Sequence, residues 1–281
     1  MSSDTAVILF SKDRAMQLDA AIRSCRAQCT DLLSVEKFII FKTTSKIHAN
    51  QYKQLQDENQ DFVCMEETQV IQQVSAIISH FTYISFHCDD NMYIRPFSFS
   101  KGIQILSKNK SILGHSFRLG RNVKYSYTRN SPEPQPIFTD LGQKVLRFNW
   151  TTMKPRGFGY PFEVSASIYR CQHILPLILN CSNCTIGGIE THLMNSRKKF
   201  LVSCPLFTCE ELSSVISIPI NTVGAVPNIS GQKYNYPIED LARKFSKNFR
   251  IDTDQFNNHT SETTHVELKF SFERKPNERM E

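Results

Sequence analysis

The sequence lacks both the long apolar runs of membrane-spanning proteins and the basic start of a secretory leader. Nowhere in its 281 residues do about 18 apolar residues follow one another, so no transmembrane helix is predicted. No basic region precedes the apolar run at residues 6–10, and that run is too short for a signal peptide. Read as a complete chain, the sequence predicts a cytoplasmic protein, with a position at the inner face of the membrane left open.

The sequence also lacks a large net charge of either sign. The 33 Lys and Arg residues exceed the 27 Asp and Glu residues by six, and residues 197–199 form the single tight basic cluster. This scatter predicts no nucleic-acid partner, because nucleic-acid-binding surfaces concentrate their basic side chains. The mild positive excess suits a polyanionic ligand, although an ordinary basic surface has the same composition. Peripheral contact with anionic lipid stays open without a basic amphipathic helix to support it. No oligomeric state is predicted.

Cysteine is abundant, with nine residues. In a chain without a secretory signal we expect them to be reduced and most of them to serve as small core residues. Cys181 and Cys184 form a C-x2-C pair, and Cys204 and Cys209 follow as C-x4-C. This spacing is close to that of a four-thiolate zinc site, so structural zinc stays open as an alternative.

Apolar runs alternate with segments of helical periodicity through about the first ninety residues. Strands and helices in this order predict an α/β fold with a parallel sheet covered by helices. Because such sheets bind ligands at the carboxyl ends of their strands, residues 11–14 and 88–91 are expected at one edge. The predicted strands are residues 5–10, 37–41, 61–65 and 83–87, and the predicted helices are residues 15–30, 48–59 and 67–80.

The second half is less regular, and residues 129–140 with their three prolines predict a loop near the cleft. We expect one domain over residues 1–256, followed by a loose polar tail at residues 257–281, although residues 266–272 alternate enough for a strand. The other predicted helices are residues 96–107, 171–179, 188–195 and 238–248, and the other predicted strands are residues 111–119 and 144–150.

An acidic turn follows the last strand of the first half, in the segment TYISFHCDDNMYIRP at residues 82–96. It presents Asp89, Asp90 and Asn91 where that strand ends. Hard divalent cations such as Mg²⁺ and Mn²⁺ take oxygen ligands of this kind, and substrate phosphates complete the shell. Asp and Asn are also common in ordinary turns, so the pattern by itself leaves both interpretations open.

The segments AVILFSKDRAMQLDAAIRS and ISFHCDDNMYIRP resemble the nucleotide-binding half of GT-A glycosyltransferases, particularly bacterial family-2-like enzymes. Four later segments, GHSFRLGRN, FNW, RGFGYPFEVSASIYR and GIETHL, extend the resemblance in order over about residues 5–250. The resemblance implies a Rossmann-like, mainly parallel mixed sheet flanked by helices. It assigns the nucleotide-sugar to about residues 1–110 and the acceptor to residues 111–256.

The resemblance also implies roles for residues of two loops. Asp90 would be the main metal ligand, and Asp89 would contact the ribose or the water shell of the metal. Asn91 would belong to the metal site as well, but it stands where many members have a third acid, which leaves the need for a metal open. The residues that match the nucleotide-contacting loop after the first strand are Ser11, Asp13 and Arg14.

A carboxylate base is needed if the acceptor hydroxyl attacks from the face opposite the leaving group. Glu190 is the first candidate, because two glycines precede it and a helix start would present it to the cleft; Glu163 is the second. An acid that merely stabilises a helix start would show the same pattern. Aromatic rings that offer a platform to an acceptor sugar are expected at Trp150, Phe158 and Tyr160, with a core position for Trp150 equally open.

These features predict a glycosyltransferase that moves a sugar from a UDP- or GDP-linked donor to a glycan or glycoconjugate hydroxyl. It would depend on Mn²⁺ or Mg²⁺ and would invert the anomeric centre. One alternative is a non-catalytic binding protein on the same fold. Another is a nucleotidyltransferase, but the segment SKDRAMQL after the first strand lacks the glycines of a phosphate-binding loop.

Overall fold

The computed structural model describes residues 4–181, 185–222 and 229–275. Strands and helices alternate through its first half, as the sequence predicts, and strands from both halves join one sheet. The strands of this sheet are β1 (Thr5–Lys12), β2 (Glu36–Lys42), β3 (Val63–Glu66), β4 (Tyr83–Cys88), β6 (Ile112–Ser116), β9 (Thr139–Asp140), β10 (Val145–Asn149), β11 (Ser167–Arg170) and β12 (Leu206–Glu210).

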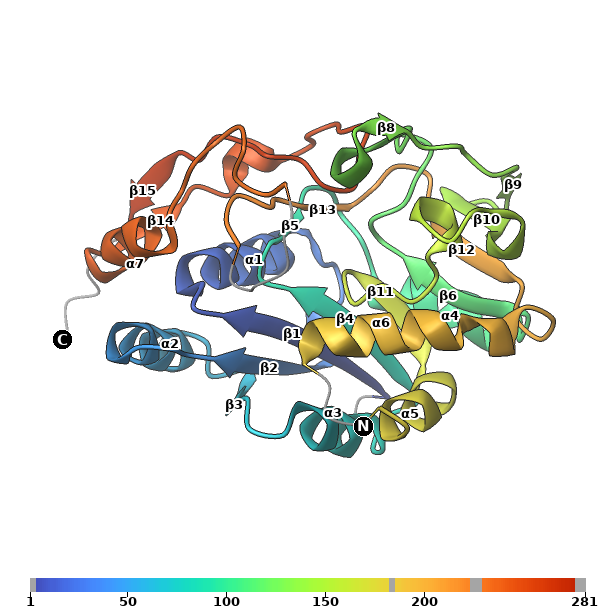
Figure 1. Cartoon of the computed structure of the whole chain (residues 1–281), viewed down its shortest axis with the longest axis horizontal. Coiled ribbons are helices and arrows are strands. Elements are labelled where there is room, and N and C mark those ends of the chain that lie inside the picture. The colour runs from blue at the N-terminus through green and yellow to red at the C-terminus, as the bar shows by residue number, and fades with distance from the viewer. Residues whose placement is uncertain (1–3, 182–184, 223–228, 276–281) are drawn as a thin grey trace.

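The main sheet is mixed, with the strand order β3-β2-β1-β4-β11-β6-β12-β10-β9 (Figure 1). Strands β3, β2, β1 and β4 run parallel to one another. Strand β11 is antiparallel to both of its neighbours, β4 and β6, whereas β12 runs parallel to β6 and antiparallel to β10. The α/β class and the mixed, partly parallel sheet are therefore confirmed.

Helices cover both faces of the sheet, and the two hydrophobic cores follow from the alternation of its side chains. In β1, Val7 and Leu9 belong to one core, whereas Ala6, Ile8 and Phe10 belong to the other. No helix within the described ranges is long and apolar enough to cross a bilayer. The first core includes residues of α1 (Ala15–Gln28), α2 (Lys46–Glu58), α4 (Phe99–Lys108) and α7 (Ile238–Ser246), and the second includes residues of α3 (Val70–Ile78), α5 (Cys171–Leu179) and α6 (Ile186–Ser196).

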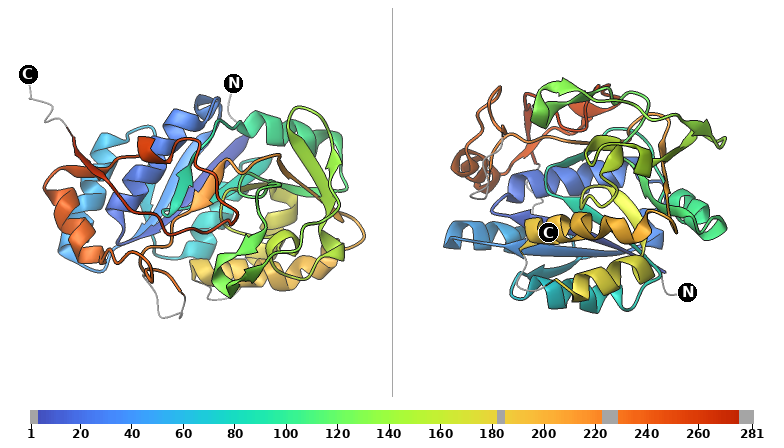
Figure 2. Two further views of the ribbon diagram at one scale, coloured as in Figure 1. Left: turned by 90° about the horizontal axis from the view of Figure 1, so that it is seen from above. Right: turned by 45° about the vertical axis from the view of Figure 1, so that its right-hand side comes forward.

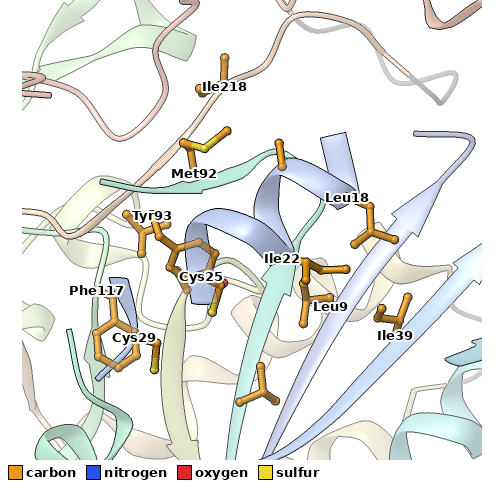
Figure 3. Packing of buried hydrophobic residues seen from close by; sticks show 14 of the residues in the cluster. Leu9, Leu18, Ile22, Cys25, Cys29, Ile39, Met92, Tyr93, Phe117 and Ile218 are labelled. Carbon is orange, nitrogen blue, oxygen red and sulfur yellow. The ribbon is translucent and has the colours of Figure 1, made fainter. Parts of the chain in front are cut away.

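Helix α1 is enclosed on more than one side, and ten of its fourteen residues are buried. Leu18 and Ile22 lie toward Leu9 of β1, while Met92 and Ile218 lie on the far side of the helix (Figure 3). Because α1 is buried so completely, its start at Ala15 is fixed in position. The loop directly before it, residues 11–14, is the predicted ligand-binding loop. Met92 belongs to the short antiparallel pair β5 (Asn91–Tyr93) and β13 (Val215–Ser217).

Three strands of the main sheet, β9, β11 and β12, were not expected from the sequence. Cys209 is buried in β12 and Cys204 is buried just before it, and both are free. Cys181 is in a disulfide, so the expectation of a reduced thiol at this position is wrong, and Cys184 lies outside the described residues. Across the ranges that the structure describes, no group of three or more His, Cys, Asp or Glu residues could hold a metal ion. These observations do not support the four-thiolate zinc site.

The expected loose tail is wrong for residues 257–275. Phe270 is buried and stacks on Tyr236, with ring centroids 5.0 Å apart. The end of the described chain forms β15 (Phe272–Arg274), which pairs antiparallel with β14 (Phe249–Ile251). The segment runs along the same side of the sheet as α1 (Figure 2, left). The remaining short strands are β7 (Tyr125–Ser126) and β8 (Ser131–Pro132), which pair with each other.

Replacing Phe270 with alanine tests the packed C-terminal segment. Phe270 is 5% exposed in the first core, so Phe270→Ala is expected to lower the free energy of unfolding by about 3–5 kcal/mol. Urea denaturation followed by circular dichroism measures this change. Lys269→Ala, at the exposed neighbouring position, is the control and should change stability by less than about 0.5 kcal/mol. Equal stability of the two variants would show that the segment is loosely attached.

Candidate functional site

The loops after β1 and β4 lie together, as the sequence predicts for neighbouring parallel strands. The backbone N–H of Asp89 donates to the carbonyl of Phe10 at 3.0 Å. The Asp89 carboxylate accepts hydrogen bonds from Ser11 Oγ at 2.8 Å and from the backbone N–H of Lys12 at 3.3 Å. It also forms an ion pair with Arg14, with Nη1 and Oδ1 3.1 Å apart. The predicted meeting of the two loops is confirmed.

The side chains of the first loop are engaged with protein atoms. The Ser11 hydroxyl also contacts the hydroxyl of Tyr52 in α2. Asp13 is buried and has a positive φ of 54°, and its carboxylate accepts from Thr44 N at 2.8 Å and Thr44 Oγ1 at 2.9 Å. Asp13 thereby ties this loop to the segment after β2. Direct contact of Ser11, Asp13 and Arg14 with a nucleotide stays a prediction.

Asn91 has a structural role in the acidic turn. It is fully buried, and its Oδ1 accepts the backbone N–H of Cys88 at 3.0 Å. Its Nδ2 donates to Ser165 Oγ at 2.8 Å and to Ser217 Oγ at 3.0 Å. The carboxamide therefore closes the turn and holds two neighbouring segments, so its expected place among the metal ligands is not supported.

A cavity of about 350 Å³ opens beside the acidic turn, and it brings together residues from distant parts of the chain. Asp90 lines it together with Glu163 and Glu190, the two base candidates that the sequence had suggested. Arg118 and His265 line the same cavity. Burial and the nearby Asp89 charge raise the pKa of Asp90 above its usual range. Burial, and secondarily Arg118, lowers the pKa of His265 to about 3, so its imidazole is neutral.

Glu190 is presented to the cavity by α6, which begins at Ile186 behind the cap residue Thr185. The Tyr160 hydroxyl donates to Glu190 Oε1 at 2.9 Å, and the Val164 backbone N–H donates to Oε2 at 3.2 Å. Burial raises the pKa of Glu190, although these two hydrogen bonds act in the opposite direction. An oriented carboxylate with a raised pKa in a cavity is suited to accept a proton.

Glu163 is less suited to that role because protein donors already occupy its carboxylate. Its Oε1 accepts from Ser116 Oγ at 3.1 Å and from Ser167 Oγ at 2.8 Å. Its Oε2 accepts from Arg118 Nη2 at 2.6 Å. Both oxygens of this carboxylate are therefore engaged by protein donors, which leaves less room for a bond to an acceptor hydroxyl. The geometry therefore favours Glu190 over Glu163.

The expected aromatic platform is wrong in two of its three members. Trp150 and Phe158 are 2% and 1% exposed, and the Trp150 indole N–H is bonded to a backbone carbonyl inside the core. A ring buried in this way has no face to offer a sugar. Tyr160 does line the cavity, and it is joined there by Tyr125 and Tyr127, which the sequence had not singled out.

Two further residues of the cavity escaped prediction. Arg118 lies within GHSFRLGRN, so the resemblance marked its segment without assigning it a role. His265 lies in the segment that was expected to be loose, and it pairs with Ser217 of β13 through a single β-bridge. No local pattern distinguishes this histidine from a surface one, because its partners are far away in the sequence.

The donor set fits a hard divalent cation that shares its ligands with a substrate. Asp90 supplies carboxylate oxygens to the cavity, and the described ranges contain no larger cluster of His, Cys, Asp or Glu that would complete a site on its own. Mg²⁺ sites commonly use one or two protein carboxylates and take their remaining ligands from substrate phosphates and water. The residues present therefore fit a Mg²⁺- or Mn²⁺-diphosphate complex better than a structural metal centre.

Comparison with known proteins gives one sequence relative and several solved structures of similar fold. No protein-family model matches the chain. The bifunctional glycosyltransferase pgtA of Dictyostelium discoideum is 24% identical over 188 residues, which cover 61% of this chain and 24% of that protein. The solved structure of S. aureus TarS residues 1–349 covers 77% of this chain and 61% of that one, with a TM-score of 0.50 and 9% identity. The chain has a GT-A-like glycosyltransferase fold.

The GT-A-like chain is shorter than these proteins, since it spans about a quarter of pgtA and less than two thirds of the TarS fragment. The same TarS fragment has been solved with UDP, and that structure covers 75% of this chain and 58% of its own, with a TM-score of 0.47 and 12% identity. Mannosyltransferase PcManGT from Pyrobaculum calidifontis has been solved with GDP-Man and Mn²⁺, and that structure covers 43% of this chain and 37% of its own. Its identity of 12% and TM-score of 0.35 are too low to indicate a shared fold.

Proposed function

We propose that this protein transfers a hexosyl group from a nucleotide-sugar to an acceptor hydroxyl. The observation that carries the proposal is one cavity that holds Asp90, from the end of β4, and Glu190, from α6. An acid suited to a metal-diphosphate and a separate acid suited to proton transfer are the two groups that such a reaction needs. The GT-A-like fold and the distant similarity to a glycosyltransferase support the same conclusion.

The donor would bind at the carboxyl ends of β1 and β4. Asp90 would hold Mn²⁺ or Mg²⁺ together with the diphosphate of a UDP- or GDP-sugar. The bound metal would neutralise the charge of the diphosphate leaving group. Arg14 and Asp89, joined by their ion pair, keep the loop after β1 next to the acidic turn. Ser11 and Asp13 shape that loop, which would contact the nucleoside.

Glu190 would accept the proton of the acceptor hydroxyl as its oxygen attacks the anomeric carbon. The Tyr160 hydroxyl and the Val164 N–H fix the carboxylate in place. A base opposite the leaving group gives inversion at the anomeric carbon, so we propose an inverting reaction. The rings of Tyr125, Tyr127 and Tyr160 would form the acceptor wall, because aromatic faces suit the apolar faces of sugars. The acceptor would be a glycan or glycoconjugate.

Release of nucleoside diphosphate from a panel of UDP- and GDP-sugars tests the proposal. The purified chain is incubated with each donor, with and without Mn²⁺ or Mg²⁺, in the presence of simple glycan acceptors. We expect turnover with at least one donor and little turnover after the cation is chelated. Binding of a nucleotide-sugar without any turnover would favour a non-catalytic protein on this fold. Neither binding nor turnover with any donor would refute the proposal.

The variant Tyr160→Phe tests Glu190 as the base through the pH dependence of kcat. The base works when deprotonated, so kcat should rise with pH through the pKa of Glu190. The Tyr160 hydrogen bond lowers that pKa, and its loss should move the acidic limb of the profile to higher pH. Tyr125→Phe removes a hydroxyl that instead contacts Asn130 and should leave the limb in place. An unmoved or lowered limb in Tyr160→Phe would contradict the assignment.

A further inference from the structure

Arg118 is a buried cation in the cavity wall for which the proposed mechanism has no role so far. It follows β6 and is 7% exposed. Its Nη2 donates to Glu163 Oε2 at 2.6 Å, and its Nη1 donates to Ser165 Oγ at 3.0 Å and Ser217 Oγ at 2.8 Å. Because these partners come from separate segments, the plane of the guanidinium is fixed before any ligand binds.

The guanidinium of Arg118 keeps hydrogen-bonding capacity in reserve. Arginine has five N–H donors, and the short bonds to Glu163, Ser165 and Ser217 use three of them. Nε has no hydrogen-bond partner among the described residues, and Nη2 donates there to Glu163 alone. Buried donors are seldom left without an acceptor in a folded protein. Nε is shielded from the cavity, so the second N–H of Nη2 is the donor that can reach an acceptor group on a ligand in the cavity that Arg118 lines.

The position of this charge points to an anionic acceptor group. Burial by itself would lower the pKa of Arg118, but the neighbouring charges of Glu163, Asp90 and Glu190 raise it, so the guanidinium stays charged. Its Nη1 lies 3.5 Å from Nε2 of His265. The imidazole of His265 is neutral because its pKa is lowered, so it adds no second positive charge beside the guanidinium. A fixed cation thus stands close to both the acid of the proposed diphosphate site and the proposed base.

We propose that Arg118 is a catalytic residue that donates a hydrogen bond to the β-phosphate of the nucleoside diphosphate. This inference rests on the proposed function. The acceptor oxygen forms a bond to the anomeric carbon, and the bond from that carbon to the β-phosphate oxygen breaks. The electron pair of the broken bond stays on the phosphate oxygen, and the acceptor proton passes to Glu190. Arg118 stabilises the charge that grows on the phosphate, because its donors are oriented in advance. Glu163 is its positioning residue.

The variant Arg118→Lys keeps the positive charge but removes the planar guanidinium with its several donors. Comparing nucleoside diphosphates with the matching monophosphates then tests whether the contact is to the β-phosphate. Calorimetric titration with UDP and UMP, and with GDP and GMP in parallel, compares ligands that differ in the β-phosphate. We expect the affinity of Arg118→Lys for the diphosphate to fall about tenfold or more and its affinity for the monophosphate to stay within about twofold. A merely structural role would weaken both ligands equally, and that result would overturn the inference.

Arg121→Lys is the matched control, because Arg121 lies three residues away with an exposed side chain beside Phe138, outside the cavity wall. It should bind both ligands as the unaltered protein does. If the unaltered protein binds neither nucleoside diphosphate, the proposed function fails and this inference fails with it. If the unaltered protein binds one and Arg118→Lys binds it equally well, the inference about Arg118 alone is overturned.

A crystal structure of the unaltered protein with Mn²⁺ and the preferred nucleoside diphosphate tests the same contact without a substitution. We expect a guanidinium nitrogen of Arg118 within about 3.2 Å of a β-phosphate oxygen. This readout holds even if Arg118→Lys proves unable to fold. A bound diphosphate whose β-phosphate lies beyond hydrogen-bonding reach of Arg118 would overturn the inference.

Discussion

Asp90→Ala is expected to lower sugar transfer, measured as kcat/KM with the preferred donor, by about 1,000-fold or more. Asp90 is the acid of the turn that faces the cavity, whereas the Asp89 carboxylate is occupied by Ser11, Lys12 and Arg14. Without Asp90 the proposed cation would lose its protein carboxylate, and the charge of the diphosphate leaving group would be less well compensated. Steady-state kinetics over a range of Mn²⁺ concentrations measures the loss.

Two controls sharpen the test of Asp90. Asp240→Asn alters a partly exposed acid in the first turn of α7 that pairs with Arg243, and it should keep full activity and Mn²⁺ dependence. Thermal unfolding should show that Asp90→Ala remains folded. The raised pKa of Asp90 means that its surroundings disfavour its charged form, so removing this carboxylate does not remove a stabilising charge. An active, Mn²⁺-dependent Asp90→Ala protein would place the metal elsewhere and would contradict the proposed donor site.

Glu190→Gln is expected to lower kcat by about 10²- to 10⁴-fold while donor binding is retained. The amide keeps the size of the carboxylate and still accepts one hydrogen bond from the Tyr160 hydroxyl, but it cannot take a proton. Single-turnover kinetics with a saturating donor separates the chemical step from binding. Glu239→Gln, at the exposed start of α7, is the control and should leave kcat unchanged.

The outcome for Glu190 also decides between the two acids of the cavity. If Glu190→Gln keeps its activity and Glu163→Gln loses it together with its acidic limb, the base is Glu163. The structure argues against this result, because Ser116, Ser167 and Arg118 already bond to the two oxygens of the Glu163 carboxylate.

The parallel half of the fold could be predicted because its rules are local. Each buried strand is a short apolar run, and each connecting helix has an apolar stripe, so the positions of β1 to β4 follow from the pattern. The meeting of Arg14 with Asp89 then follows from the geometry of parallel strands, since the loops after neighbouring strands share an edge.

The remaining features depend on contacts that no local pattern records. For Trp150 the sequence left a platform position and a core position equally open, and the structure shows the core position. Asn91 has the side chain of a metal ligand, yet Ser165 and Ser217, which follow it by 74 and 126 positions, occupy its amide. His265 reaches the cavity because the C-terminal segment packs alongside β13, and its polar sequence had predicted a loose tail.

Calorimetric titration of the unaltered protein with UDP and with GDP, each with and without Mn²⁺, tests the central claim most directly. The claim is that the loops after β1 and β4 hold a nucleoside diphosphate through a divalent cation at Asp90. We expect one of the two nucleotides to bind with a Kd in the micromolar range in the presence of Mn²⁺ and at least tenfold more weakly after chelation, on the order of 1.4 kcal/mol. Absence of binding by both nucleotides in Mn²⁺ would contradict the account.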